Sequence, residues 1–173
     1  MILITGVTGT VGGAVSAHLQ GLNVPHRALV RDVARAAAGP GVTLVAGDLA
    51  RPETLEASLA GVERAFLLSP PVADSLELEK GFIAAAKRAG VRHVVKLSSY
   101  GAAPDAGYYF GQQHGLGEQA LEASGLAYTM LQPNGFYQNF LGNAGSIKTQ
   151  NINALLGSSL YQIYEIRSNF RIV

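Results

Sequence analysis

The fold is decided by the first stretch of the chain, ILITGVTGTVGG at residues 2–13. An apolar run of strand length ends at Gly6, and Gly9 and Gly12 follow at three-residue intervals before helix-permissive sequence begins at Ala14. This pattern predicts a strand, a glycine turn and the start of a helix.

Each of these glycines has a physical role in such a unit. One lets the chain reverse, one lets the backbone approach a pyrophosphate, and one lets the helix pack close to the strand. The free amides of the helix N-terminus would face the phosphates. The spacing is one residue longer than Gly-x-Gly-x-x-Gly, and the alternative is a tight turn without a ligand. The residues predicted to bind a cofactor here are Gly6, Thr8, Gly9, Thr10, Val11 and Gly12.

The composition indicates one ordinary domain. A chain of 173 residues can bury roughly 70 per cent of its unfolded surface. Charged residues make up 14% and the net charge is +1, so neither nucleic acid nor a membrane surface is indicated as a partner. Without cysteine there is no disulfide framework or thiolate nucleophile, and no metal site is predicted. The chain opens directly into a strand and has no apolar run of membrane-span length, so we expect a soluble, cytoplasmic protein.

Strand and helix patterns alternate along the rest of the chain. Apolar segments predict further strands at residues 26–30, 42–46, 64–68, 91–97 and 127–131. Helices are predicted at residues 11–21, in the alanine-rich segment after Asp32, and at 52–59, 74–89 and 109–124. This alternation predicts an α/β fold, a Rossmann-type doubly wound parallel sheet of about six strands in the order 3-2-1-4-5-6.

Ligands of such a sheet bind outside the carboxyl ends of its strands. The segments that follow the strands are Gly6 to Gly12, Arg31-Asp32, Asp48-Leu49, Leu68-Ser69-Pro70 and Ser98-Ser99. We predict that these segments lie along one edge and form the cofactor site.

Arg31 carries the prediction of the cofactor type. A cation directly after the second strand is where a 2'-phosphate would be met, and Arg35, one helical turn on, could assist. Asp32 raises a competing interpretation, because an acid near this place hydrogen-bonds the ribose 2'-hydroxyl of NAD. We interpret Asp32 instead as a cap of the following helix. NADPH is therefore the predicted cofactor, NAD is the less favoured one, and a solvated arginine without a ligand is the alternative.

The other edge segments have two interpretations each. Asp48 and Leu49 either bracket an adenine or merely end a strand. The segment Leu68-Ser69-Pro70 either lets the backbone pass close to the cofactor ribose or is an ordinary loop. Ser98 and Ser99 are expected to touch the cofactor or the substrate.

Several of these motifs together resemble one known family. They are ITGVTGTVG at residues 4–12, ALVRD at 28–32, GDL at 47–49, VVKLSS at 94–99 and LQPNGF at 131–136. As a set they are similar to the NmrA-like branch of the atypical short-chain dehydrogenases. The resemblance covers about residues 1–146 and implies a Rossmann domain with an NAD(P)H cofactor. It also implies Pro133 and Asn134 as cofactor-binding residues. The family includes quinone and dye reductases as well as redox-sensing regulators.

The chain departs from the Tyr-x-x-x-Lys dyad of typical short-chain dehydrogenases. Tyr109 is followed four residues on by Gln113, and a register taken from Glu118 puts His114 in place of the lysine and Phe110 in place of the tyrosine. His114 could donate a hydrogen bond to a substrate or to the nicotinamide ribose, because a histidine pKa lies near working pH; the alternative is an exposed helical histidine. Tyr109 and its neighbour Tyr108 are further candidate donors. A quinone-like acceptor can also take its proton from water.

A nucleophile-base interpretation competes with this one. Ser98, Asp105 and His114 are the right residue types for a hydrolase, but no Gly-x-Ser-x-Gly elbow is present. His18, His26 and His93 lack ligand spacing and are expected to be structural.

The composition changes abruptly at the end of the chain. Residues 1–145 contain 24 alanines and 3 isoleucines, whereas residues 146–173 contain 1 alanine and 5 isoleucines. We therefore predict a cofactor domain at residues 1–146 and an atypical tail at 147–173. The tail is expected to be out-of-family sequence of a truncated product or, alternatively, a lineage-specific ending. The predicted function is hydride transfer from NADPH to a small organic acceptor such as a quinone or dye. A non-catalytic redox sensor, an inactive truncated product and a possible homodimer are the alternatives carried forward.

Overall fold

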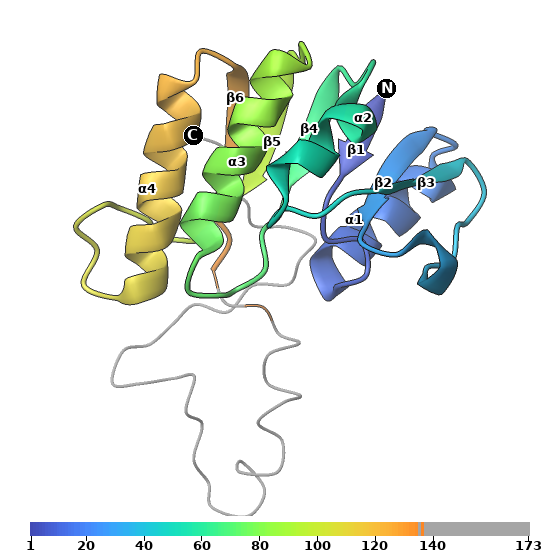
Figure 1. The fold of residues 1–173 in the computed structure, drawn as a ribbon. Coiled ribbons are helices and arrows are strands. Elements are labelled where there is room, and N and C mark those ends of the chain that lie inside the picture. The colour runs from blue at the N-terminus through green and yellow to red at the C-terminus, as the bar shows by residue number, and fades with distance from the viewer. Residues whose placement is uncertain (135, 137–173) are drawn as a thin grey trace, which may run out of the picture.

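The part of the chain that the computed structural model describes, residues 1–134 and 136, forms a six-stranded parallel sheet (Figure 1). The strands are β1 (Ile2–Ile4), β2 (His26–Val30), β3 (Val42–Ala46), β4 (Arg64–Leu67), β5 (His93–Leu97) and β6 (Ala127–Leu131). They lie in the order β3-β2-β1-β4-β5-β6, and every neighbouring pair is parallel. The predicted α/β fold and its strand order 3-2-1-4-5-6 are confirmed. The predicted tail at 147–173 and the domain boundary before it lie outside the described residues.

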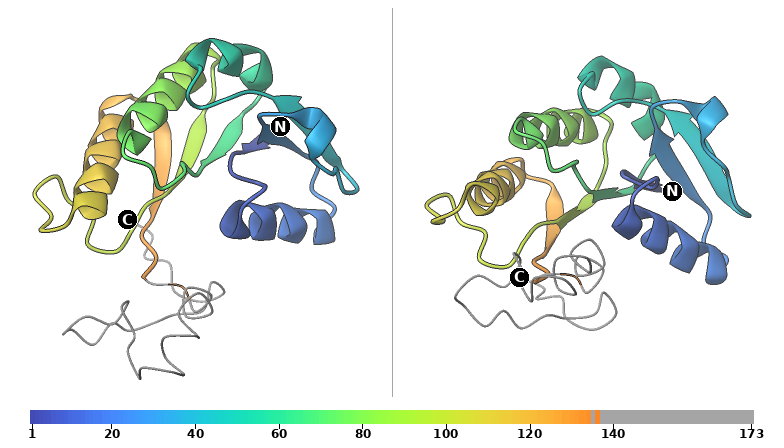
Figure 2. Two further views of the ribbon diagram at one scale, coloured as in Figure 1. Left: turned by 60° about the horizontal axis from the view of Figure 1, so that its bottom comes forward. Right: turned by 90° about the horizontal axis from the view of Figure 1, so that it is seen from below.

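Helices cover both faces of the sheet. The α-helices are α1 (Thr10–Gly21), α2 (Leu55–Leu59), α3 (Ser75–Arg88) and α4 (Tyr109–Ala123), and two 3₁₀ turns are η1 (Val33–Arg35) and η2 (Pro52–Thr54). Figure 2 shows α1 on one face of the sheet and α2, α3 and α4 on the other. This is the layering of a doubly wound sheet, in which each crossover returns to the amino edge before the next strand begins.

The core is divided between the two faces because successive side chains of a strand point in opposite directions. On one face, Leu3 packs in a cluster that contains Phe82 and Leu121 of α3 and α4. On the other face, Ile4 packs in a second cluster, against which Val15 of α1 lies. Leu3, Ile4, Phe82 and Leu121 are all fully buried. The apolar run at the start of the chain therefore supplies both halves of the core and fixes β1 at the centre of the sheet.

The prediction of an alanine-rich helix after Asp32 is wrong. The segment between β2 and β3 contains only the 3₁₀ turn η1, and the residues after it run on without regular structure to Gly41, which has a φ of +73°. The physical reason lies in Gly39-Pro40-Gly41, because proline disfavours a helical residue before it and both glycines oppose helix. The alanines before them are too few to pay the cost of helix nucleation.

The predicted helix at residues 52–59 begins as the 3₁₀ turn η2, with Pro52 in its first turn, and continues as α2. The other boundaries differ from the predictions by at most two residues. Among the described residues, no helix has both the length and the apolar character needed to cross a membrane.

Candidate functional site

Backbone hydrogen bonds connect the glycines of the turn between β1 and α1. Gly6 has a φ of +67°, a conformation that other residues rarely adopt. The amide of Gly9 donates to the carbonyl of Gly6 at 3.0 Å, and the amide of Gly13 donates to the carbonyl of Gly9 at 2.9 Å. Gly9 is the N-cap of α1 and no side chain caps the helix. The first amides of α1 are therefore left without a side-chain acceptor at the carboxyl edge of the sheet.

Gly12 sets how closely α1 approaches β1. A Cβ atom at this position would lie 2.3 Å from the carbonyl oxygen of Gly6 and 2.9 Å from that of Thr5. Both atoms belong to the backbone and cannot move aside. At Gly9 the nearest atom, the Gly6 carbonyl oxygen, would lie 3.4 Å away. Gly12 is thus required by the packing of the helix on the strand, whereas Gly9 leaves the turn uncrowded.

Thr5 joins this turn to the segment after β4. Its Oγ1 accepts from the amide of Leu68 at 2.8 Å and donates to the carbonyl of Leu68 at 2.8 Å. A Cβ on Gly6 would come within 2.9 Å of the Leu68 side chain. The predicted segments around Gly6 and Leu68 therefore lie in contact. Thr5 is not among the residues that the sequence predicts for the site. A threonine directly after a short apolar strand could have indicated a polar contact here.

The segments after β2 and β3 are organised by their own aspartates. Asp32 accepts from the amide of Ala34 at 2.9 Å and caps η1, so the predicted cap is present although it caps a 3₁₀ turn. Arg31 is exposed and makes no ion pair within residues 1–134. Asp48 accepts from the amide of Ala50 at 3.0 Å. These contacts leave the Arg31 guanidinium available to a ligand while both carboxylates stabilise loops.

Leu49 and Pro70 complete the predicted set on this side. Leu49 is partly buried and packs against the larger core cluster. The carbonyl of Pro70 accepts from the amide of Val72 at 2.9 Å, which turns the chain toward α3. In Figure 1 the turn before α1 and the loop before α3 both lie at the lower edge of the sheet.

The segments after β5 and β6 lie side by side. The amide of Ser98 donates to the carbonyl of Leu131 at 2.7 Å, and the amide of Tyr100 donates to the carbonyl of Pro133 at 2.9 Å. The hydroxyl oxygens of Ser98 and Ser99 are buried and have no hydrogen-bond partner within residues 1–134 and 136. Buried hydroxyls usually find a partner, so two unpaired ones at the carboxyl edge fit a polar ligand there. Asn134 follows directly in this segment.

A buried polar cluster connects the edge to α3 and α4. The ammonium of Lys96 on β5 lies 2.9 Å from Glu79 Oε1 and 3.2 Å from His114 Nδ1, and Ser69 Oγ donates to the same Glu79 oxygen at 2.8 Å. The side chains of Lys96 and Glu79 are 0% and 3% exposed. Ser69 and His114, which the sequence assigned to the site, are therefore joined by two residues that it did not. A charged residue inside the otherwise apolar run VVKL was the signal for this pair.

The electrostatics of His114 differ from the expectation. Burial, with a further contribution from the Lys96 ammonium, lowers its pKa from 6.5 to about 4. The expectation of a pKa near working pH is wrong, because it took the histidine to be solvated. A neutral imidazole still carries one N–H, so hydrogen-bond donation remains chemically available while proton donation from an imidazolium does not.

The two tyrosine hydroxyls at the start of α4 both donate to carbonyls of neighbouring loops. Tyr109 Oη donates to the carbonyl of Ala73, and Tyr108 Oη donates to the carbonyl of Tyr100 at 2.8 Å. Both rings are about half exposed. A role for Tyr109 as proton donor stays a prediction, and it requires that hydroxyl to leave Ala73.

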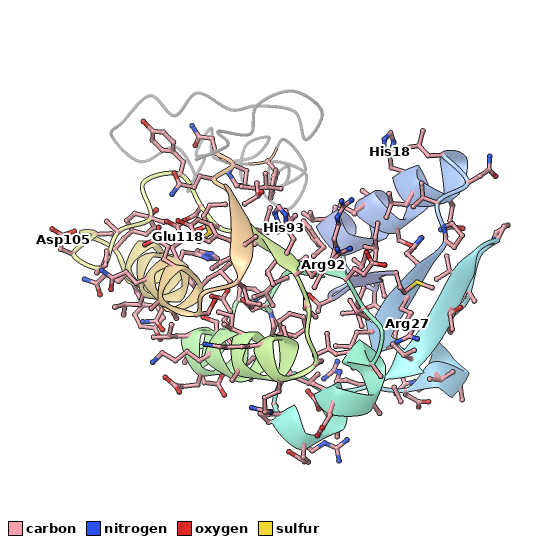
Figure 3. The ribbon with its side chains drawn as sticks, turned by 90° about the horizontal axis from the view of Figure 1, so that it is seen from above. His18, Arg27, Arg92, His93, Asp105 and Glu118 are labelled. Atoms are coloured by element: carbon pink, nitrogen blue, oxygen red, sulfur yellow. The ribbon has the colours of Figure 1, made fainter. Side chains whose placement is uncertain are left out.

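Among the described residues, the remaining histidines and acidic residues form no second polar cluster of the kind needed for a metal or a triad. Figure 3 shows Asp105 at the outer end of the loop before α4 and His18 on the outside of α1. Asp105 makes no hydrogen bond to Ser98 or His114, although all three are described, so a hydrolytic triad is not assembled. Buried His26 is satisfied by Ser16 Oγ at 2.8 Å and the Val24 carbonyl at 3.0 Å. Within residues 1–134 and 136, no group of three acidic or histidine side chains could hold a metal ion.

The model of the NmrA-like family matches residues 1–157. The chain belongs to the NmrA-like family. The resemblance drawn from the sequence motifs is therefore confirmed.

Two curated reductases have sequences similar to that of this chain. An NAD(P)H azoreductase of Xenophilus azovorans is 43% identical over 150 residues, which are 86% of this chain and 52% of the azoreductase. The quinone oxidoreductase 2 of Escherichia coli strain K12 is 32% identical over 150 residues, which are 83% of this chain and 52% of that protein. The chain spans about half the length of these curated relatives.

A solved structure agrees with the sequence comparison. The triphenylmethane reductase of Citrobacter sp., complexed with NADP(H), has a TM-score of 0.78 and 30% sequence identity. The match covers 86% of this chain and 55% of the reductase. The fold of this chain is thus similar to that of a reductase whose structure was solved with NADP(H).

The packing at Gly12 predicts the outcome of a matched pair of substitutions in α1. Gly12→Ala should lower the free energy of unfolding by about 1 to 3 kcal/mol, because the new methyl group meets the backbone of Thr5 and Gly6 directly after β1. Gly21→Ala, at the last residue of the same helix, has nothing within 4 Å and should raise it by up to about 1 kcal/mol. Urea unfolding of both variants measures the difference. Equal stabilities would contradict the close packing of α1 on β1.

The lowered pKa of His114 predicts a pH dependence of stability. Between pH 6.5 and about 4 the unfolded chain binds a proton that the folded protein excludes. Stability from this group is therefore present above pH 6.5 and decreases as the pH falls, by on the order of 2 to 3 kcal/mol. His114→Asn keeps an acceptor for Lys96 and removes the titration. Urea unfolding at several pH values should give a shallower acid dependence for the variant, and parallel curves would contradict the burial of His114.

Proposed function

We propose that the protein binds NADPH at the carboxyl edge of its sheet and transfers a hydride from it to a small organic acceptor such as a quinone or dye. The observation that carries the proposal is the turn at Gly6, Gly9 and Gly12, which leaves uncapped amides at the start of α1. Relatives named as NAD(P)H azoreductase and quinone oxidoreductase support the same conclusion. When bound, the dinucleotide supplies the hydride.

The phosphate-binding residues in this proposal are those of the glycine turn and Arg31. The backbone of Thr8, Gly9, Thr10 and Val11 offers N–H donors and a favourable helix dipole to a pyrophosphate. Arg31 offers a guanidinium at the end of β2 to a 2'-phosphate, and it is exposed. NAD is less favoured, because the Asp32 carboxylate that would bind its ribose already caps η1.

The other predicted residues complete the proposed cradle along the edge. Asp48 and Leu49 would bracket the adenine, and the backbone of Leu68, Ser69 and Pro70 would pass the ribose. At the β5 and β6 ends, Ser98 and Ser99 have buried hydroxyls available to the cofactor or the acceptor. Pro133 and Asn134 lie in the segment after β6. The hydrogen bond from the Tyr100 amide to the Pro133 carbonyl holds this segment beside the segment after β5.

Proton supply differs from that of typical short-chain dehydrogenases in this proposal. His114 is neutral at pH 7, since its pKa is about 4. It can orient or polarise an acceptor oxygen by donating a hydrogen bond, whereas the proton itself comes from water or from Tyr109. A quinone or dye that accepts a hydride needs no strong acid beside it.

Turnover distinguishes this function from that of a redox sensor. NADPH consumption by the purified protein is measured with a benzoquinone, an azo dye and a triphenylmethane dye. Consumption that requires one of these acceptors supports the reductase. Tight binding of the oxidised nucleotide without consumption with any acceptor would contradict it and favour a sensor.

Self-association through the edge strands β3 and β6 stays a separate prediction, which sedimentation measures.

The position of Arg31 predicts the cofactor preference of a variant. Arg31→Ala should weaken NADPH binding about tenfold to a hundredfold, the equivalent of one charge-assisted hydrogen bond, and leave NADH binding unchanged. Arg88→Ala removes the same charge at the far end of α3 and serves as the matched control, with both affinities unaltered. An unchanged NADPH to NADH ratio in Arg31→Ala would rule out the proposed role.

A further inference from the structure

The buried pair of Lys96 and Glu79 has no role in the cofactor contacts proposed above. Lys96 comes from β5, the strand next to the edge strand β6, and Glu79 from the buried face of α3. A buried ion pair costs desolvation, and unless its remaining donors and acceptors are satisfied it adds little to stability. The hydrogen-bond partners of the pair therefore indicate which role the pair has in the protein.

The three N–H groups of the Lys96 ammonium meet three acceptors. They are Glu79 Oε1 at 2.9 Å, the carbonyl oxygen of Leu97 at 3.4 Å and His114 Nδ1 at 3.2 Å. An ammonium has no acceptor, so Nδ1 of His114 must receive this hydrogen bond. The single proton of the neutral imidazole is then on Nε2.

We propose that Lys96 is a positioning residue that fixes His114 in the tautomer with its proton on Nε2, so that the imidazole presents one N–H donor to the acceptor of the hydride. Lys96 is fully buried, so in this proposal it acts through His114. The role of the donor rests on the proposed function, whereas the tautomer does not.

The surroundings of the pair keep it in place. Glu79 Oε1 also receives the hydroxyl of Ser69 at 2.8 Å, which ties the pair to the segment after β4. A Cβ on Gly117 would lie 2.1 Å from Glu79 Oε2 and 3.0 Å from Lys96 Cε, so any side chain here would have to displace the pair. His114 lies one turn before Gly117 on the same helix. The close approach of α4 therefore brings His114 within reach of Lys96.

The other charged group near His114 on α4 is already engaged. Glu118, one turn further along, accepts from Gln132 Nε2 at 2.9 Å and 3.1 Å. Figure 3 shows Glu118 on α4. Lys96, Glu79 and Glu118 are the charged groups of β5, α3 and α4 at this place, and only Lys96 bonds the imidazole. The Nε2 atom has no partner within residues 1–134 and 136, which leaves its N–H for a ligand.

The test reads the tautomer directly. Long-range proton–nitrogen correlation spectra of the full ¹⁵N-labelled chain at pH 7, without cofactor, give the protonation of each imidazole nitrogen, and His114→Asn assigns the signals. The expected result is an unprotonated Nδ1 and a protonated Nε2 at His114. A proton on Nδ1, or a mixture of tautomers, would overturn the proposal whether or not the protein binds NADPH.

Variants then assign the effect to Lys96. Lys96→Met with Glu79→Gln removes both charges together and should give a mixture of tautomers at His114. Gly117→Ala displaces the pair by steric contact and should act in the same direction, which serves if the double variant does not fold. An Nε2–H tautomer as pure as in the unaltered protein, in whichever variant folds, would overturn the role of Lys96. If the reductase activity is present, kcat should fall about tenfold while KM for NADPH is unchanged, as expected for loss of roughly one hydrogen bond.

Discussion

The space between the Gly6 carbonyl and Gly12 is the constraint on which the rest of the site depends. A side chain at position 12 would collide with the backbone of Thr5 and Gly6 directly after β1, so glycine is required for α1 to lie against this turn. That approach aims the uncapped start of α1 at the carboxyl edge. Thr5 then fixes the segment after β4 beside the turn. The geometry of the proposed phosphate site thus depends on the absence of a side chain at position 12.

A second constraint lies on the other side of the sheet, where charge is buried rather than exposed. Breaking a buried pair by removing one partner costs about 3 to 5 kcal/mol, because the remaining charge is uncompensated. Lys96 and Glu79 form such a buried pair, with Ser69, Leu97 and His114 as further hydrogen-bond partners. Glu79 Oε2 has no partner among the described residues. The pair therefore couples the segments after β4 and β5 to α4, so the two halves of the proposed site share one rigid support.

Local patterns in the sequence were enough to predict the sheet but not the buried cluster of Lys96, Glu79 and His114. Strands β2, β3 and β6 have the predicted bounds, because short apolar runs between glycine, proline and charged residues leave little choice of register. The alanine-rich segment after Asp32 was mispredicted because Gly39 and Pro40 outweigh a few good helix formers. Contacts between distant elements were missed altogether: Lys96 and Glu79 are 17 residues apart, and the low pKa of His114 comes from burial that only the folded chain creates.

The central claim is that the carboxyl edge of the sheet is a nicotinamide dinucleotide site with a place for the 2'-phosphate. A fluorescence titration of the unaltered protein with NADPH, and in parallel with NADH, tests it most directly. The account predicts saturable NADPH binding in the micromolar range and much weaker NADH binding. Binding of neither nucleotide to the folded protein would contradict it, and the glycine turn would then serve only to pack α1 on β1.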